Sequence, residues 1–214
     1  MALSQIAATA LCHQLAFFLG AIAVGFLVGR VMGADVRKQG SGNVGATNVG
    51  RLLGKKAGVI TLLGDMIKGA AAVGLALLIF PSSAFSIYGP TFGAAAIAGH
   101  CFSPFLRFRG GKGVATSLGV FLILATYPTL AAVAVFALAL RCFGYVSLSS
   151  LSAAAALPIL LGFQFAQHNA SPALLGAAIA AAALIFLRHS TNISRLRLGT
   201  EKKFSFACRT AADS

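Results

Sequence analysis

Long apolar stretches separated by short basic loops dominate the pattern of this chain. A transmembrane helix needs roughly 20 consecutive apolar residues. Six stretches come close to this length or exceed it: residues 11–31, 57–80, 86–105, 114–140, 145–165 and 172–187. Five of them each predict one transmembrane helix. Residues 114–140 are too long for one crossing and short for two, so a second criterion must decide whether they cross the membrane once or twice.

The distribution of Lys and Arg supplies that criterion, because cytoplasmic loops of membrane proteins collect both residues. Basic clusters lie at 30–56, 107–112, 141 and 188–209. The turns near Pro81, Pro128 and 164–171 contain no Lys or Arg. If 114–140 crosses twice and folds back near Pro128, every basic cluster is cytoplasmic. The sequence therefore predicts an all-α, polytopic integral membrane protein of about seven transmembrane helices, with its N-terminus outside and its C-terminus cytoplasmic.

Composition supports a membrane environment and narrows the partners. The chain is 58% hydrophobic and 10% charged, too few charges to coat a water-facing surface. No linker divides residues 1–214, which predicts a single domain. The net charge of +13 comes without the basic stripe of a soluble nucleic-acid module, so anionic lipids or phosphorylated substrates are expected instead. Four scattered acids form no carboxylate cluster, so neither a metal nor another cofactor is expected.

A glycine-rich loop over 40–51 carries the first candidate chemistry, GSGNVGATNVGR. It contains G-x-G-x-x-G, but no strand precedes it, so the dinucleotide-binding interpretation fails. Closely spaced glycines allow backbone N–H groups to converge on an anion. Side chains can add hydrogen bonds, and an arginine can hold phosphate through two of them. The residues concerned are Gly40, Ser41, Gly42, Asn43, Gly45, Thr47, Asn48 and Arg51. The alternative is a flexible turn.

Two charged residues fall inside the second predicted span. Asp65 and Lys68 are three positions apart, so they share a helix face and can pair. Charges within a membrane span are costly and usually functional. The alternative is a structural pair that neutralises itself near the cytoplasmic rim.

The second basic loop, residues 99–116, ends in Gly110-Gly111-Lys112-Gly113. It differs from a P-loop, because Leu106 stands where the first glycine would be. It still predicts a glycine-rich turn that leads into a helix, whose N-terminus attracts phosphate. Arg107 and Arg109 can equally be topology anchors.

The last basic segment begins at Arg188. His189, Asn192 and Arg195 recur every three residues there, so on a helix they form one polar edge. A single histidine is usually structural, but three polar residues in register at the end of a span favour a site.

Together these segments resemble the acyl-phosphate-dependent glycerol-3-phosphate acyltransferases of bacterial membranes. The motifs that carry the resemblance are GSGNVGATNVGR, GDMIKG, GHCFSPFLRFRGGKGVAT and RHSTNISRLRLGTEKKF, in the family's order. The resemblance implies transfer of a fatty acyl group from acyl phosphate to the primary hydroxyl of glycerol 3-phosphate, giving lysophosphatidic acid and phosphate. It implies the seven-helix architecture and a cytoplasmic active site in the bacterial plasma membrane.

The motifs and the resemblance together predict a set of site residues with three kinds of role. Catalytic roles are expected for Ser41, Asn43, Arg51, Lys112 and His189. Binding of substrate phosphate is expected for Gly40, Gly42, Gly45, Thr47, Asn48, Lys68, Gly111, Gly113 and Asn192. Supporting roles are expected for Asp65, His100, Arg195 and Glu201.

The residues also limit the mechanism. Acyl phosphate is an activated mixed anhydride, so a covalent acyl-enzyme is unnecessary, and no Ser or Cys with a His-Asp relay is evident. No histidine has Asp five positions on, which disfavours the acyl-CoA-type glycerolipid acyltransferases; those positions hold Phe18, Phe105, Ala173 and Ser194. Catalysis by positioning and charge stabilisation is expected. The hydroxyl proton goes either to the substrate's own phosphate or to His189.

One alternative function stays open at this point, a membrane transporter of phosphate or an organic phosphate. The polar residues gather at the cytoplasmic rim, whereas a carrier needs a site near the midplane. The odd helix count and the lack of an internal repeat also disfavour it. For the acyltransferase, the expected partners are acyl phosphate, glycerol 3-phosphate and membrane lipids, with no nucleic acid, and the chain is expected to be a monomer.

Overall fold

Ten α-helices and two short 3-10 turns form the part of the chain that the computed structural model describes, residues 3–204. In chain order the α-helices are α1 Leu3–Ala21, α2 Val24–Val31, α3 Ala46–Leu53, α4 Lys55–Ile79, α5 Phe85–Cys101, α6 Val114–Leu124, α7 Thr126–Phe143, α8 Val146–Ala166, α9 Pro172–Arg188 and α10 Ser190–Arg197. All regular structure in this range is helical, which confirms the all-α class. The chain termini, for which opposite sides of the membrane are predicted, lie outside the described residues, as do the ends of the predicted domain 1–214.

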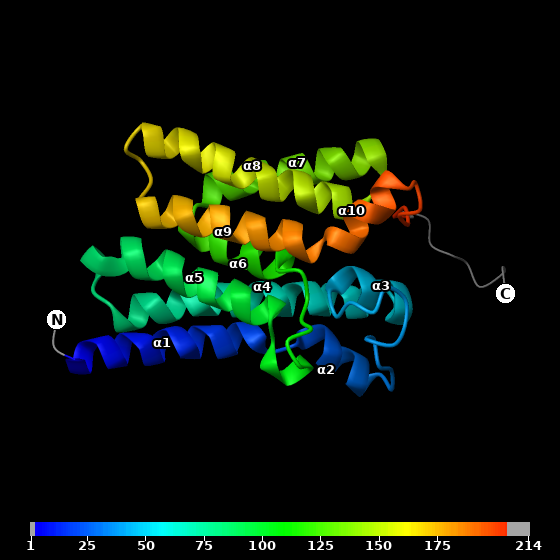
Figure 1. Ribbon diagram of the computed structural model, residues 1–214, viewed down its shortest axis with the longest axis horizontal. Coiled ribbons are helices and arrows are strands. Elements are labelled where there is room, and N and C mark those ends of the chain that lie inside the picture. The colour runs from blue at the N-terminus through cyan, green and yellow to red at the C-terminus, as the bar shows by residue number, and fades with distance from the viewer. Residues whose placement is uncertain (1–2, 205–214) are drawn as a thin grey trace.

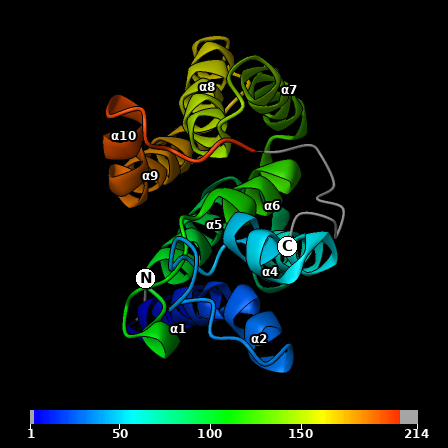
Figure 2. The same ribbon diagram turned by 90° about the vertical axis from the view of Figure 1, so that its right-hand side faces the viewer.

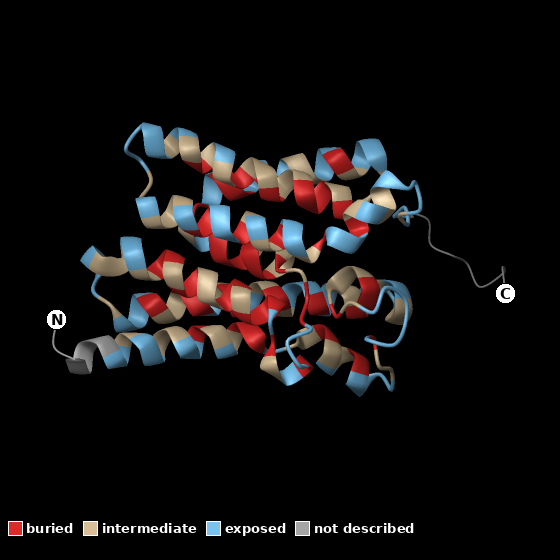
Figure 3. Ribbon diagram, viewed as in Figure 1, coloured by how far each residue is buried: buried red, intermediate tan, exposed pale blue. Residues whose placement is uncertain are grey.

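Four helical segments in the described range are long and apolar enough to cross a membrane. They are Ala7–Val31, which combines α1 and α2, then α4, α7 and α8. The pair α9 and α10, bent by 59°, makes a fifth if it counts as one span. Exposed residues are spread along the outside of these helices (Figure 3). They include large apolar side chains, for example Leu78 at 86% exposure. Such a surface suits lipid as the solvent and supports the predicted membrane protein.

Two predicted spans differ in detail from the structure. The span 11–31 is interrupted, because α1 ends at Ala21 and α2 begins at Val24. Residues 114–140 do form two helices, but the chain breaks at Ala125, three residues before Pro128. Figure 1 shows α7 returning toward the end of the molecule at which α6 begins. Pro128 lies in the first turn of α7, where its missing N–H removes no helical hydrogen bond.

The helices α4, α5 and α6 form the centre of the bundle. Figures 1 and 2 show α1 and α2 on one side of them and α7, α8 and α9 on the other. α5 contacts α1, α4, α6 and α9, so it joins the two sides. A buried apolar cluster joins α4, α5, α6, α7, α8 and α9, and its fully buried members include Ile97, Val120, Phe121 and Leu161. This packing fixes where each loop leaves the bundle.

Glycines allow the central helices to approach one another closely. A Cβ on Gly119 of α6 would lie 1.9 Å from the Met66 carbonyl oxygen of α4, and one on Gly69 of α4 would lie 2.3 Å from the Thr116 oxygen. The crossing of α1 and α5 has the same character, with Gly20 and Gly99 against backbone atoms of the opposite helix. Small residues at helix crossings are the usual means of close packing in membranes.

Buried polar side chains cover the break between α1 and α2. The Lys68 ammonium donates to the Ile22 carbonyl at 2.6 Å, and the Ser103 hydroxyl donates to the Ala21 carbonyl at 2.6 Å. Lys68 also pairs with the Asp65 carboxylate at 2.8 Å, which confirms the predicted pairing. His100 Nδ1 lies 3.5 Å from the same carboxylate. Backbone carbonyls freed inside a membrane need such partners, since each unsatisfied group costs several kcal/mol.

The close contact at Gly119 yields a stability prediction. We expect Gly119→Ala to lower the thermal unfolding midpoint in detergent, because the new methyl group forces α4 and α6 apart at a cost of about 1–3 kcal/mol. Gly162→Ala on α8 is the matched control, since a Cβ there meets no atom within 4 Å. Equal midpoints for the two variants would show that the helices do not touch at Gly119.

Candidate active site

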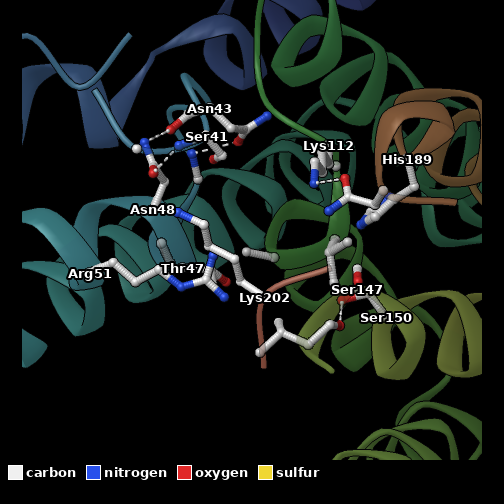
Figure 4. A pocket seen from close by; sticks show the side chains of 18 of the residues that line it. Ser41, Asn43, Thr47, Asn48, Arg51, Lys112, Ser147, Ser150, His189 and Lys202 are labelled. Atoms are coloured by element: carbon white, nitrogen blue, oxygen red, sulfur yellow. Dashed lines mark hydrogen bonds between the residues drawn. The ribbon is translucent and has the colours of Figure 1, made fainter. Parts of the chain in front are cut away.

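A cavity of about 290 Å³ opens at the end of the bundle where the basic loops gather (Figure 4). The loop before α3, the turn before α6, the α9–α10 junction and the segment after α10 all contribute to it. Its lining residues are Gly40, Ser41, Asn43, Gly45, Ala46, Thr47, Asn48, Arg51, Leu62, Asp65, His100, Lys112, Gly113, Val114, Ala115, Phe136, Val146, Ser147, Ser150, His189, Asn192, Arg195, Thr200, Glu201 and Lys202. Segments far apart in the sequence therefore meet in one site.

Asn48 organises the glycine-rich loop. Its side-chain nitrogen donates to the carbonyls of Val36, Gln39 and Asn43, and its Oδ1 accepts from the Ser41 N–H at 2.9 Å. All polar atoms of this buried amide are therefore used within the loop. Gly40 has φ +63° and sits against Asn48 Oδ1, so a side chain there would be strained and would displace the amide. The structure thus gives Asn48 a loop-shaping position, although it was predicted to bind phosphate.

Several glycine N–H groups that were predicted to face an anion are also committed within the protein. Gly42 N–H donates to the Gln39 carbonyl, Gly45 N–H to Asn43 Oδ1 and Gly111 N–H to the His100 carbonyl. Gly42 and Gly111 do not line the cavity. The glycines shape the loops, and the side chains of Ser41, Thr47 and Arg51 are left to face the cavity (Figure 4).

Lys112 enters the cavity beside the N-terminus of α6. Gly113, with φ +83°, turns the chain into the helix at Val114, as the sequence predicts. N–H groups in the first turn of a helix lack partners within that helix, so they and the ammonium present positive charge together. The Lys112 ammonium donates to Asn192 Oδ1. Burial is the main cause that lowers the pKa of Lys112 to about 8; Glu201 opposes it, and nearby arginines act in the same direction as burial.

Glu201 ties the segment after α10 to two helices. Its Oε1 accepts from the Ser147 hydroxyl at 2.8 Å and from the Asn192 side-chain nitrogen at 2.6 Å, and its Oε2 accepts from Arg195 Nε at 2.6 Å. Burial alone would raise the pKa of Glu201, but the hydrogen bonds from Arg195, Asn192 and Ser147 outweigh it and lower that pKa. Because Asn192 also contacts Lys112, the carboxylate indirectly holds the ammonium.

His189 occupies the bend between α9 and α10. Its Nδ1 lies 2.8 Å from the Ile185 carbonyl, which can only accept, so Nδ1 carries the proton in this contact. Nε2 of the neutral ring is then a hydrogen-bond acceptor that can face the cavity. His189, Asn192 and Arg195 all line the cavity, which confirms the polar edge predicted from their spacing.

Of the predicted residues, all but Gly42, Lys68 and Gly111 line the cavity. The ammonium of Lys68 lies instead on Asp65 and the Ile22 carbonyl, one layer below the site. Asp65 and His100 reach the lining from that layer. Ser147, Ser150, Phe136 and Lys202 also line the cavity and were not predicted from the sequence. The signal available for Ser147 and Ser150 was a pair of hydroxyls three positions apart at the start of an apolar span.

No group of three or more metal-ligating side chains occurs within residues 3–204. The chemistry that the described groups offer is anion binding by cationic side chains, hydroxyl orientation by Ser41 or His189 Nε2, and a histidine lone pair able to receive a proton.

The chain matches the family model described as glycerol-3-phosphate acyltransferase over residues 10–199. A relative of that name from Trichlorobacter lovleyi is 48% identical over 189 residues, which cover 88% of this chain and 94% of the relative. Another, from Geobacter sulfurreducens, is 42% identical over 190 residues with the same coverage.

Two crystal structures of PlsY (YgiH), an integral membrane glycerol 3-phosphate acyltransferase, share the fold. Its glycerol 3-phosphate form has a TM-score of 0.83 at 36% identity, and its lysophosphatidic acid form a TM-score of 0.81 at 35% identity. Each alignment covers 92% of this chain and 96% of the other.

The contacts of Glu201 generate a pH-dependent stability prediction. Because the folded-state pKa of Glu201 lies below its ordinary value of 4.5, its stabilisation is present above pH 4.5 and is lost as the pH falls through the folded-state pKa. We expect Glu201→Gln to unfold at a lower temperature than wild type at pH 7. The difference should shrink as the pH falls below 4.5 in thermal melts. A difference that stays constant with pH would rule out the carboxylate charge as its source.

Proposed function

This chain belongs to the glycerol-3-phosphate acyltransferase family, and we propose that its acyl donor is a fatty acyl phosphate. The family makes it a membrane enzyme of phospholipid synthesis that acylates glycerol 3-phosphate. Of the two functions that the sequence left open, the acyltransferase is therefore the one retained. The donor, the residue roles and the placement in the membrane are the proposed parts.

The observation that carries the donor proposal is that cationic and apolar side chains line the same cavity. Arg51, Lys112, Arg195 and Lys202 line the same cavity, so one site gathers four positive charges. An acyl phosphate and glycerol 3-phosphate each bring one phosphate group. The lining also includes Leu62, Val114, Ala115, Phe136 and Val146, which suits the start of a fatty acyl chain.

The proposed reaction is a direct acyl transfer. The primary hydroxyl of glycerol 3-phosphate attacks the carbonyl carbon of the acyl phosphate. The bond between that carbon and the phosphate oxygen breaks, and phosphate leaves with the electron pair. The hydroxyl proton ends on the departing phosphate, either directly or by way of His189 Nε2. No covalent acyl-enzyme is required, because phosphate is already a good leaving group.

The residues act in this reaction by position and charge. Arg51 and Lys112 bind the phosphate groups and stabilise the negative charge that grows on the departing one. Ser41 and Thr47 donate hydrogen bonds from the loop. Asn43 uses its Oδ1 on Gly45, so its amide nitrogen is the atom that can orient substrate. Gly40, Gly45 and Gly113 allow the backbone to approach the bound groups.

We further propose a seven-helix topology within one domain over 1–214, with the N-terminus outside and the active site cytoplasmic. The basic end residues of α2, α4 and α7, namely Arg30, Lys55, Lys56 and Arg141, support it, because these helix ends lie at the cavity end of the bundle (Figure 1). The location is the plasma membrane of a bacterium. The enzyme works as a monomer surrounded by lipids, without a cofactor or nucleic acid.

A donor comparison tests the proposed reaction. Detergent-purified protein receives labelled glycerol 3-phosphate with palmitoyl phosphate, palmitoyl-CoA or no donor, without added metal. We expect lysophosphatidic acid only with palmitoyl phosphate, and a loss of about 10²-fold or more in Lys112→Ala, the range seen when a charge-stabilising group is removed. Product with palmitoyl-CoA alone would refute the donor assignment, and full activity of Lys112→Ala would refute the role of that residue.

The pKa of Lys112 predicts a pH profile. With a pKa of about 8, the ammonium loses its proton as the pH rises through 8, so phosphate binding weakens. We expect kcat/KM for glycerol 3-phosphate to fall above pH 8 in wild type, since this parameter reports groups of the free enzyme. Lys112→Arg keeps its charge at high pH and should show a flat profile there at lower absolute activity. A profile that falls equally in both proteins would assign the titration to another group.

A further inference from the structure

The two residues before Lys112 are held on both sides of the backbone. Gly110 N–H donates to the Cys101 carbonyl at 3.2 Å, and Gly111 N–H donates to the His100 carbonyl at 3.0 Å. These bonds attach one side of the turn to the end of α5. The carbonyl groups of Gly110 and Gly111 point the other way, toward α9.

Arg188, the last residue of α9, donates a hydrogen bond to each of these two carbonyls. Its Nε donates to the Gly111 carbonyl at 3.0 Å, and its Nη2 donates to the Gly110 carbonyl at 2.7 Å. The guanidinium carbon also lies 5.8 Å from the centre of the Phe102 ring. All four backbone hydrogen-bonding groups of Gly110 and Gly111 are thus occupied, two by α5 and two by this one side chain.

The planar guanidinium is suited to this contact. Nε and Nη2 form a rigid fork that can meet two neighbouring carbonyls together, whereas a lysine ammonium is a single charge on a flexible stem. Gly111 packs closely against the His100 ring, since a Cβ there would lie 2.1 Å from His100 Nε2. The turn is therefore clamped between the His100 ring and the Arg188 fork.

We infer that Arg188 is a positioning residue, which fixes the backbone turn at Gly110 and Gly111 and so aims the Lys112 ammonium into the cavity. This inference rests on the proposed phosphate-binding role of Lys112. Arg188 directly precedes His189 at the α9–α10 bend, so the same clamp holds the turn before Lys112 next to the segment that carries His189 and Asn192, the hydrogen-bond partner of Lys112.

Equilibrium binding of radiolabelled glycerol 3-phosphate to the detergent-purified full chain tests the inference. The variants are Arg188→Gln, Arg188→Lys, Lys112→Ala and the double variant Arg188→Gln/Lys112→Ala. Arg141→Gln is the matched control, because it removes one positive charge from an exposed arginine at the same end of the bundle. Thermal melts and gel filtration establish that each variant is folded.

Arg188→Gln should weaken binding at least about tenfold, and Arg188→Lys nearly as much, because the charge remains but the fork is lost. In the Lys112→Ala background, Arg188→Gln should cause no further loss, since residues that act through one another are not additive. Arg141→Gln should bind as wild type does. Arg188→Lys also serves as the second test if Arg188→Gln does not fold.

Three results would overturn the inference: wild-type affinity in Arg188→Gln, full affinity in Arg188→Lys, or losses that multiply in the double variant. The last would mean that Arg188 contacts the ligand itself, from the smaller cavity that it lines behind Lys112 and Asn192. Wild-type affinity in Lys112→Ala would instead refute the proposed role of Lys112. A weakened Lys112→Ala beside an unaffected Arg188→Gln would refute the present inference alone.

Discussion

The satisfaction of buried polar groups in an apolar bundle governs the rest of this structure. The first membrane segment breaks at Ile22, and the carbonyls of Ala21 and Ile22 need hydrogen-bond donors from elsewhere in the bundle. Lys68 and Ser103 supply the missing donors, and Asp65 supplies the counter-charge for Lys68. These contacts join the first segment to α4 and to the loop after α5. Asp65 also contacts His100, and both residues line the cavity, so these buried charges connect the first segment to the site. The charges that are costly within a span therefore support the site above them.

The cavity itself depends on a few acceptors placed among many cations. The cationic side chains Arg51, Lys112, Arg195 and Lys202 repel one another when no anion is present. Of the two carboxylates in the lining, Asp65 pairs with Lys68, and Glu201 accepts a hydrogen bond from Arg195. Glu201 joins α8 to α10 through Ser147, Asn192 and Arg195, and its one charge does not neutralise the whole cluster. The protein thus retains a positive cavity. The hydrogen bonds of Asn48 and Arg188 to backbone groups hold the loops in place against the repulsion between the cationic side chains.

Periodicity, charge and motif content predicted the helical class, the pairing of Asp65 with Lys68 and most of the cavity lining. These features depend on local spacing, which the sequence displays directly. The roles of backbone amides were harder to predict. Gly42 and Gly111 suggest open anion sites, but their N–H groups are consumed by tertiary contacts that only the folded chain reveals. The break after Ala21 was missed for a similar reason, because its stabilising donors lie far away in the sequence. Ser147 was missed because its partner is remote.

The cationic cavity has a consequence for turnover. In the proposed reaction two phosphate groups enter the site and two leave it, one on the lipid product and one as the free ion. Side chains that recognise only the phosphate charge bind reactants and products alike, so they hasten capture without driving release. The lipid product can depart sideways along its own tail into the leaflet, whereas the free ion must escape past the same arginines and lysines. In the proposed reaction, inorganic phosphate therefore competes with both substrates for the same cationic side chains.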